Sequence, residues 1–180
     1  MSAATIYTDR LILIPFTLAT TRFLLAGDTS ILNEIGLQIT ANWPDQEAIE
    51  TLPKILRNLE LVQEPTGFES WMIVLKSKKT VIGDAGFKGR PNAEGEVDIG
   101  YAIIEQEHKK GYGMEAAKAL TDWAFQQPEV RAVTAKCLIS NTASARILEK
   151  LGLQKTNRDD EMIHWSVIKP NQHKLVAPTI

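Results

Sequence analysis

The chain contains the stretch Glu105-Gln106-Glu107-His108-Lys109-Lys110-Gly111-Tyr112-Gly113-Met114-Glu115-Ala116-Ala117-Lys118. It follows a strand-like run over residues 97–104 and opens into an amphipathic helix predicted over residues 114–125. The two glycines allow a tight turn and bring backbone N–H groups close to a ligand. The first N–H groups of a helix lack partners inside it, and the helix dipole favours negative charge there. We therefore predict an anion-binding loop, although the same pattern also occurs in plain connectors.

The composition predicts one globular domain over residues 1–180, with a core over about 8–169 and a tail over 170–180. A hydrophobic fraction of 44% is enough to build an ordinary core. The net charge of −2 argues against nucleic acid or an anionic membrane as the main partner. The single Cys137 cannot form an internal disulfide, and neither a leader-like segment nor a membrane-length apolar run is visible. We therefore expect a cytoplasmic protein.

Alternating and helical patterns along the chain predict an α+β (α/β) fold. The predicted strands cover residues 10–15, 71–75, 81–87, 96–104, 130–138, 153–157 and 162–168, and the predicted helices cover 18–25, 30–37, 49–62, 114–125 and 141–151. The second, third and fourth strands form an antiparallel meander. A helical crossover then places the fifth strand parallel to the fourth. Two glycines in the strand over 81–87 indicate a bulge or close packing.

A second informative segment is Asn141-Thr142-Ala143-Ser144-Ala145-Arg146-Ile147-Leu148-Glu149-Lys150-Leu151-Gly152-Leu153. Helix capping explains it adequately, because Asn141 or Thr142 can begin a helix, Ser144 can pair with a first-turn N–H, and Gly152 can end it. Its position one strand after the glycine loop also suits a site between two splayed parallel strands. The sequence leaves both readings open at this point.

The order of these motifs resembles the GCN5-related N-acetyltransferase (GNAT) superfamily. The similarity is strongest to the branch that contains the ribosomal-protein N-terminal acetyltransferases. Further matches to that branch are Thr8-Asp9-Arg10-Leu11-Ile12-Leu13, Val81-Ile82-Gly83-Asp84 and Asp98-Ile99-Gly100-Tyr101. The resemblance implies a mixed, mostly antiparallel sheet of six to seven strands flanked by helices, with a V-shaped split between strands four and five. It also implies transfer of an acetyl group from acetyl-coenzyme A (acetyl-CoA) to a primary amine, on a protein N-terminus or a small molecule.

The resemblance further implies a role for each residue of the two motifs. The diphosphate of coenzyme A would be held by His108, Lys109, Lys110, Gly111, Tyr112, Gly113 and Met114. His108 stands where the family usually has glutamine or arginine, and the two lysines also suit a solvated loop. Asn141 and Ser144 would contact the pantetheine or its thioester end. A backbone N–H of the bulged fourth strand, within residues 100–103 and so including Ile103, would stabilise the oxyanion.

Many family members protonate the leaving thiolate with a tyrosine, but the corresponding position here is Leu148. In the branch resembled here, a serine at the position of Ser144 lies near the sulfur and could serve instead. The general base is predicted to be Asp98, with Glu96 second and Asp84 a weaker candidate. Water, with the carboxylates forming a plain polar strand face, is the alternative. No metal is expected.

The acceptor amine is not identified by the sequence. Four aromatic residues could line its pocket or belong to the core: Trp43, Phe68, Trp71 and Phe87. Five acidic residues would attract a cationic acceptor or form a solvated helix surface: Asp45, Glu47, Glu50, Glu64 and Glu69. Two other functions stay open, a coenzyme A-binding regulator without catalysis and a mononucleotide-binding α/β domain, which the antiparallel meander argues against. Both a monomer and a homodimer are compatible with the sequence.

Overall fold

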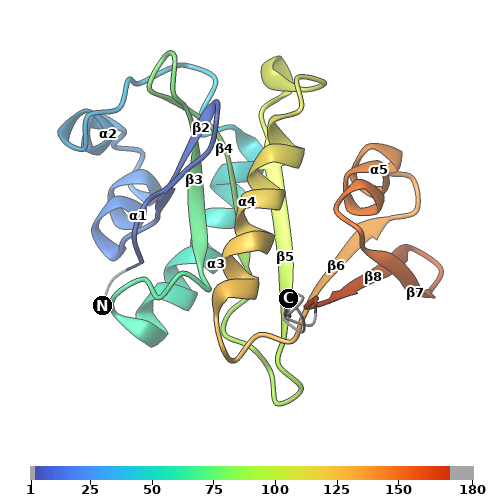
Figure 1. Ribbon diagram of the computed structural model, residues 1–180. Coiled ribbons are helices and arrows are strands. Elements are labelled where there is room, and N and C mark those ends of the chain that lie inside the picture. The colour runs from blue at the N-terminus through green and yellow to red at the C-terminus, as the bar shows by residue number, and fades with distance from the viewer. Residues whose placement is uncertain (1–2, 171–180) are drawn as a thin grey trace, which may run out of the picture.

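A computed structural model describes residues 3–170, which form one eight-stranded sheet with helices on both faces (Figure 1). Along the sheet the strand order is β1-β2-β3-β4-β5-β6-β8-β7. The strands are β1 (Ile6–Tyr7), β2 (Leu11–Pro15), β3 (Ser70–Leu75), β4 (Thr80–Phe87), β5 (Glu96–Ile103), β6 (Ala132–Leu138), β7 (Gln154–Arg158) and β8 (Met162–Ile168). The helices are α1 (Leu18–Leu25), α2 (Ser30–Glu34), α3 (Gln46–Val62), α4 (Tyr112–Gln126) and α5 (Thr142–Lys150), with a short 3-10 helix η1 (Glu105–Glu107).

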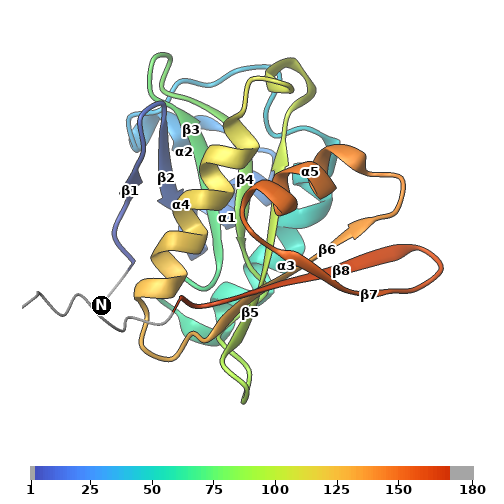
Figure 2. The same cartoon turned by 45° about the vertical axis from the view of Figure 1, so that its right-hand side comes forward.

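The sheet splits between β5 and β6, as the resemblance implies for its fourth and fifth strands. Parallel pairing joins Glu96 to Ala132 and continues only as far as Asp98 and Thr134. Beyond that point the two strands diverge, and β6 leads away with β8, β7 and α5 (Figures 1 and 2). The other pairs of neighbouring strands are antiparallel. The eighth strand is β1, which has two residues and is therefore too short to show an alternating pattern in the sequence.

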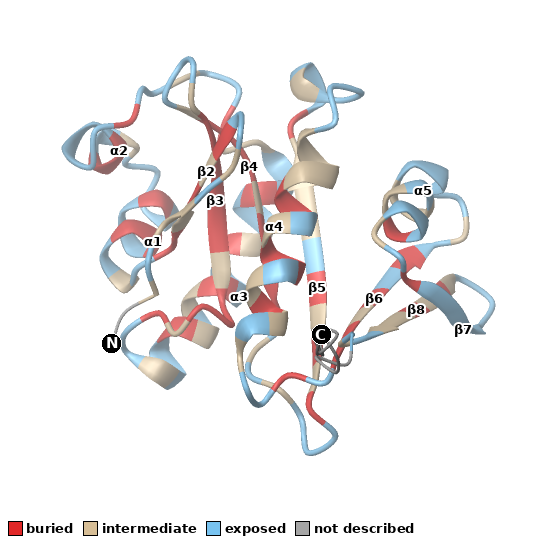
Figure 3. Cartoon of the chain, viewed as in Figure 1, coloured by how far each residue is buried: buried red, intermediate tan, exposed pale blue. Residues whose placement is uncertain are grey.

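Helix α4 covers one face of the sheet, and α1 and α3 lie on the other face, where they pack against each other (Figure 1). Trp123 of α4 anchors the first layer, with ring centroids 5.1 Å from Phe68 and 5.9 Å from both Trp71 and Phe87. These three aromatic residues and Trp43 are buried, and buried positions make up most of the central strands β3 and β4 (Figure 3). They are therefore core residues and not the lining of an acceptor pocket.

Several element boundaries differ from the sequence prediction. Helix α4 begins two residues early, because Gly111 adopts φ +83° and turns the chain directly into the helix. Ile49, where the predicted helix over residues 49–62 begins, is 48% exposed, and Ala48 is buried instead. Glu69 is buried, where its carboxylate accepts hydrogen bonds from the N–H groups of Thr66 and Gly67, so it does not face an acceptor. The tail predicted over 170–180 lies, except for Pro170, outside the described residues.

The backbones of β4 and β5 approach each other at Gly83 more closely than a residue with a side chain would allow. A Cβ atom on Gly83 would lie 2.1 Å from the carbonyl oxygen of Ala102, so close packing explains this glycine. The pairing runs without a shift from Gly83 and Ile103 to Phe87 and Ile99. The bulge that the family resemblance implies in β5 is therefore absent from this register. The irregularity in this part of the sheet lies instead between β3 and β4, at Ile73 and Val74.

Candidate active site

A cleft of about 660 Å³ opens where β5 and β6 separate. It is lined by Glu47, Tyr101, Ala102, Ile103, Glu107, His108, Lys109, Gly111, Tyr112, Gly113, Met114, Asn141, Ala143, Ser144, Arg146, Ile147 and Lys150. A smaller cavity of about 220 Å³ continues it between β5 and β6, sharing Tyr101, Asn141 and Ser144. Of the residues predicted to bind coenzyme A, only Lys110 is missing from this lining; its Nζ pairs with Glu107 Oε2 at 2.7 Å.

The glycine loop presents unpaired backbone donors to this cleft. No side chain caps the N-terminus of α4. Within residues 3–170, the N–H groups of Tyr112, Gly113 and Met114 have no hydrogen-bond acceptor. His108 Nε2 lies 2.6 Å from the carbonyl oxygen of Ile103, which accepts its hydrogen and connects the loop to the end of β5. Three free donors at a helix N-terminus fit a diphosphate.

Gly113 keeps the floor of the cleft open. A Cβ atom at this position would point between β5 and α5, at 3.5 Å from the Ile147 side chain and 3.7 Å and 3.8 Å from those of Ile103 and Tyr101. These are ordinary contact distances, so the fold itself would accept a small side chain there. The space that such a side chain would fill is therefore available to a ligand lying over the loop.

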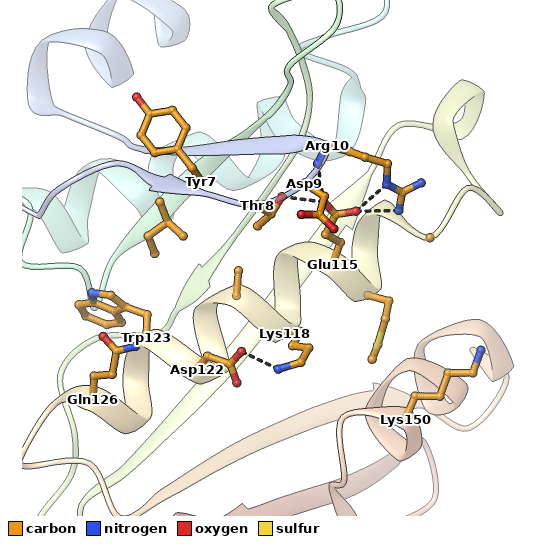
Figure 4. A pocket seen from close by; sticks show the side chains of 14 residues that line it. Tyr7, Thr8, Asp9, Arg10, Glu115, Lys118, Asp122, Trp123, Gln126 and Lys150 are labelled. Atoms are coloured by element: carbon orange, nitrogen blue, oxygen red, sulfur yellow. Dashed lines mark hydrogen bonds and ion pairs between the residues drawn. The ribbon is translucent and has the colours of Figure 1, made fainter.

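A network from the start of the chain holds the loop in place (Figure 4). The Glu115 carboxylate accepts hydrogen bonds from Thr8 Oγ1 at 2.6 Å and from Arg10 Nε at 2.7 Å. Arg10 Nη1 also donates to the carbonyl oxygen of Lys110 at 2.8 Å, and the guanidinium lies 4.6 Å from the ring centroid of Tyr112. Arg10, directly before β2, thus contacts the residues on both sides of Gly111, and Glu115 fixes its guanidinium in this position. This network was not predicted from the sequence, although the Thr8-Asp9-Arg10 match to the family was its signal.

Burial alone would raise the pKa of Glu115. The hydrogen bonds from Thr8 and Arg10, together with the Arg10 charge, outweigh it and hold the pKa below its usual value. Glu115 is therefore ionised in the network at neutral pH.

Tyr101 and Ser144 bring two hydroxyl groups together where the strands separate. Tyr101 Oη and Ser144 Oγ are hydrogen-bonded at 3.0 Å. Burial raises the pKa of Tyr101, although the hydrogen bond with Ser144 acts in the opposite direction. The cap of α5 is Asn141, whose Oδ1 accepts from the N–H of Ser144 at 3.0 Å, so the Ser144 hydroxyl is not the capping group. A role for the Tyr101 side chain was not predicted from the sequence, because only the folded sheet places it opposite α5.

Asp98 and Glu96 lie at the closed end of the split. Asp98 Oδ2 forms an ion pair with Lys88 Nζ at 2.8 Å, and Asp98 Oδ1 is buried without a partner in the described chain. Glu96 Oε2 accepts a hydrogen bond from the Asn92 side chain at 3.1 Å. Neither residue lines the cleft or the cavity that continues it. The position of both residues therefore disfavours them as the base.

Asp84, the weaker candidate, does not line the cleft or the cavity either, but its cross-strand neighbour does. Asp84 lies on β4 directly opposite Ala102, which lines the cleft together with Glu47. Burial raises the pKa of Asp84 to about 7, with further contributions from the charges of Glu47 and Asp45. A carboxyl group with this pKa can both accept and release a proton near neutral pH.

Two other features are absent from the described residues 3–170. No helix there is long and apolar enough to cross a membrane. In the same part of the chain, no group of three or more His, Cys, Asp or Glu side chains is arranged to hold a metal ion.

Comparison with known proteins finds one consistent family. The model of the family described as "Acetyltransferase (GNAT) domain" matches residues 10–154. The uncharacterized N-acetyltransferase YjdG of Bacillus subtilis is 34% identical over 138 residues, which is 77% of this chain and 82% of YjdG. The uncharacterized N-acetyltransferase YoaA of the same organism is 28% identical over 151 residues, 82% of this chain and 81% of YoaA.

Solved structures agree with this fold. The ribosomal-protein-S5-alanine acetyltransferase of Vibrio fischeri superimposes with a TM-score of 0.67 at 14% identity, covering 96% of this chain and 100% of that one. The ribosomal L7/L12 α-N-protein acetyltransferase RimL, solved in complex with coenzyme A, gives a TM-score of 0.66 at 19% identity, covering 92% and 98%. At these identities the likeness shows a shared fold.

Proposed function

Because the chain belongs to the GNAT family of acyl-CoA-dependent acetyltransferases, we propose that it transfers an acetyl group from acetyl-CoA to a primary amine by direct attack in a ternary complex. The acceptor would be a protein N-terminus or a small-molecule amine. The observation that carries this proposal is one continuous cleft with free N–H donors at one end and the Tyr101–Ser144 hydroxyl pair at the other. The first end suits a diphosphate and the second suits a leaving thiolate.

The binding of acetyl-CoA follows from this arrangement. The N–H groups of Tyr112, Gly113 and Met114 would hold the diphosphate, with Lys109 at the rim of the cleft. Lys110 would contribute through its position in the loop and not through its side chain, which pairs with Glu107. The pantetheine arm would lie along the edge of β5 beyond Asp98, because β6 no longer pairs with that edge. Asn141 and Ser144 would contact the thioester end.

The chemistry requires a neutral amine, a polarised carbonyl and a proton for the thiolate. The amine nitrogen attacks the thioester carbonyl, and a C–N bond forms while negative charge develops on the oxygen. A backbone N–H on the free edge of residues 100–103 would stabilise that charge. The C–S bond then breaks, and the thiolate takes a proton from the Tyr101–Ser144 pair, which is replenished by the proton that the attacking nitrogen loses.

We expect the purified protein to release coenzyme A thiol from acetyl-CoA when a suitable primary amine is present. A thiol-reactive dye would follow release with panels of N-terminal peptides, lysine peptides, polyamines and aminoglycosides. Mass spectrometry would identify the acetylated product. Release without an acceptor gives the background hydrolysis. If no amine of any panel stimulates thiol release while calorimetry shows that acetyl-CoA still binds, acetyl transfer would be contradicted and a coenzyme A-binding regulator favoured.

Replacing Gly113 with valine is expected to weaken acetyl-CoA binding by about tenfold or more, equivalent to about 1.4 kcal/mol. The methyl groups would occupy the space over the loop that the missing Cβ leaves open. Gly113→Ala should give an intermediate loss. Calorimetric titration with acetyl-CoA measures the effect, and the melting temperature of the unliganded variants controls for folding. Unchanged affinity in a folded Gly113→Val protein would contradict the assignment of this loop to the diphosphate.

A further inference from the structure

On the α3 side, Glu47 lines the cleft, and Asp84 lies behind the lining, next to Ala102. Side chains alternate along β5, so Ala102 points to the sheet face opposite Tyr101. Asp84 is the cross-strand neighbour of Ala102 on that same face. Glu47, in the first turn of α3, lines the same cleft as Ala102. The cleft therefore reaches both faces of the sheet at the free end of β5.

We propose that Asp84 is the general base that takes a proton from the ammonium group of the acceptor, and that Glu47 draws this cationic amine to the thioester. The inference rests on the proposed acetyl transfer and adds to it the base and the class of acceptor. Tyr101 and Ser144 serve the leaving thiolate from the α4 and α5 side. Asp84 and Glu47 would serve the incoming amine from the α3 side.

The environment of Asp84 supports this role. The titratable groups that face it are Glu47 and Asp45, and its neighbours across the strands, Met72 and Ala102, carry no charge. Burial and the two negative charges raise the pKa of Asp84 to about 7, and within residues 3–170 no hydrogen bond to the carboxylate opposes them. A base with a pKa near the working pH is the most effective proton acceptor.

The carboxylates of Asp45 and Glu47, whose charges act on Asp84, differ in the contacts they make. Asp45 caps α3, because its Oδ1 accepts from the N–H of Ala48 at 2.9 Å. Glu47 is exposed at the cleft, and its side chain forms no ion pair or hydrogen bond with the rest of residues 3–170. Glu47 is therefore free to pair with a ligand, whereas Asp45 acts on Asp84 through its charge alone. The Glu47 carboxylate at the opening, with Asp84 and Asp45 near enough for their charges to interact, favours an amine that carries a further positive charge.

The groups named account for every proton in the proposed reaction. The acceptor R–NH₃⁺ gives one proton to the Asp84 carboxylate, and the neutral nitrogen then forms the C–N bond. As the C–S bond breaks, the nitrogen loses a second proton, which reaches the thiolate through the Tyr101–Ser144 pair. Asp84 returns its proton to water. The products are the N-acetylated amine, coenzyme A thiol and one proton, with no oxidation or reduction.

The test is the pH dependence of kcat/KM for wild type, Asp84→Asn and Glu47→Gln with the best acceptor of the amine panel. Wild type should lose activity as the pH falls through about 7, because Asp84 becomes protonated. Asp84→Asn should lower kcat by about 100-fold and abolish that acidic limb, while acetyl-CoA affinity stays within about twofold. Glu47→Gln removes a charge that raises the pKa of Asp84, so the limb should move to lower pH.

The class of acceptor is tested with pairs of amines that differ by one positive charge, such as a linear diamine and the monoamine of equal length. Glu47→Gln should raise KM for the diamine about tenfold and change the monoamine little. Glu64→Gln is the charge-matched control, since Glu64 is exposed beyond the other end of α3. Equal effects of Glu47→Gln on both amines would overturn the acceptor class.

A measurement without activity checks that Asp84 occupies this environment. A raised carboxyl pKa means that the folded state loses stability as the pH rises from about 4 to about 7. The neutral Asn removes this loss, so Asp84→Asn should melt several degrees above wild type at pH 8 and close to it at pH 4. An active wild type with an unaltered Asp84→Asn profile would overturn the assignment of Asp84 alone. A wild type inert with every amine would instead overturn the proposed function.

Discussion

Replacing Ser144 with alanine is expected to lower kcat for acetyl transfer by about 100-fold while leaving acetyl-CoA affinity nearly unchanged. The Ser144 hydroxyl is hydrogen-bonded to Tyr101 Oη at 3.0 Å and lies in both the cleft and the cavity behind it. It is thus placed to give a proton to the thiolate, a task that arises only as the C–S bond breaks. Steady-state kinetics with thiol detection would measure kcat, and calorimetry would measure acetyl-CoA affinity.

The same experiment distinguishes a proton donor from a helix cap. Asn141 already caps α5, so Ser144→Ala should cost only the hydroxyl contact, about 1 kcal/mol, or about 2–4 °C in melting temperature. Ser140→Ala, an exposed serine in the loop before α5, is the matched control and should change neither quantity. A Ser144→Ala protein with lower melting temperature and normal kcat would contradict the role in proton transfer.

The Tyr101→Phe variant extends this prediction to a pair. If the two hydroxyl groups act as one relay, each single replacement should lower kcat about as much as the double replacement, because either one interrupts the path of the proton. If the two groups acted independently, the fold reductions in kcat of the two single variants would multiply in the double variant. The position of the usual family tyrosine is Leu148, which is buried in the core and supplies no hydroxyl. Tyr101 provides a phenol from the opposite strand.

The fold was largely predictable because its signals are local. Alternation marked the long strands, helical spacing marked α3 and α4, and glycine marked the loop at 111–113. The failures share one cause, the packing between elements that are distant in the sequence. Nothing in the sequence near Asp98 indicates that Lys88, directly after the neighbouring strand β4, would pair with it. Helical spacing likewise began the α3 helix at Ile49, which is exposed, whereas the packing of α3 buries Ala48.

The candidate site was predicted in part for the same reason. The predicted coenzyme A loop is a continuous stretch, so its residues could be named from the sequence, and most of them line the cleft. The proposed catalytic groups come from separate elements. Tyr101 is hydrogen-bonded to Ser144 only because α5 packs back toward β5, and the charge of Glu47 acts on Asp84 only because the first turn of α3 lies at the same cleft as the end of β5. Such contacts are set by tertiary packing, which local sequence patterns do not encode.

Replacing Glu115 with alanine is expected to destabilise the fold by about 3 kcal/mol, or about 6–12 °C in melting temperature, and to weaken acetyl-CoA binding as well. The variant leaves Thr8, the Arg10 backbone N–H and the Arg10 guanidinium without their shared acceptor. Arg10 would then no longer be fixed over Tyr112 or against Lys110, so the N–H donors of the loop would lose their alignment. Thermal melts and calorimetry with acetyl-CoA measure the two effects.

The pKa of Glu115 also predicts how the stability difference between wild type and Glu115→Ala changes with pH. The pKa of Glu115 lies below its usual value in the fold, so its contribution to stability is present above that usual value and disappears as the pH falls through the folded pKa. The gap between wild type and Glu115→Ala should therefore narrow in acid. Asp122→Asn is the control on the same helix, because it breaks only the exposed Lys118–Asp122 pair and should change stability by less than about 1 kcal/mol (Figure 4). A Glu115→Ala protein with normal stability and normal acetyl-CoA affinity would show that the loop keeps its shape without the network, and the alignment of its donors would then have to come from His108 and Gly111 alone.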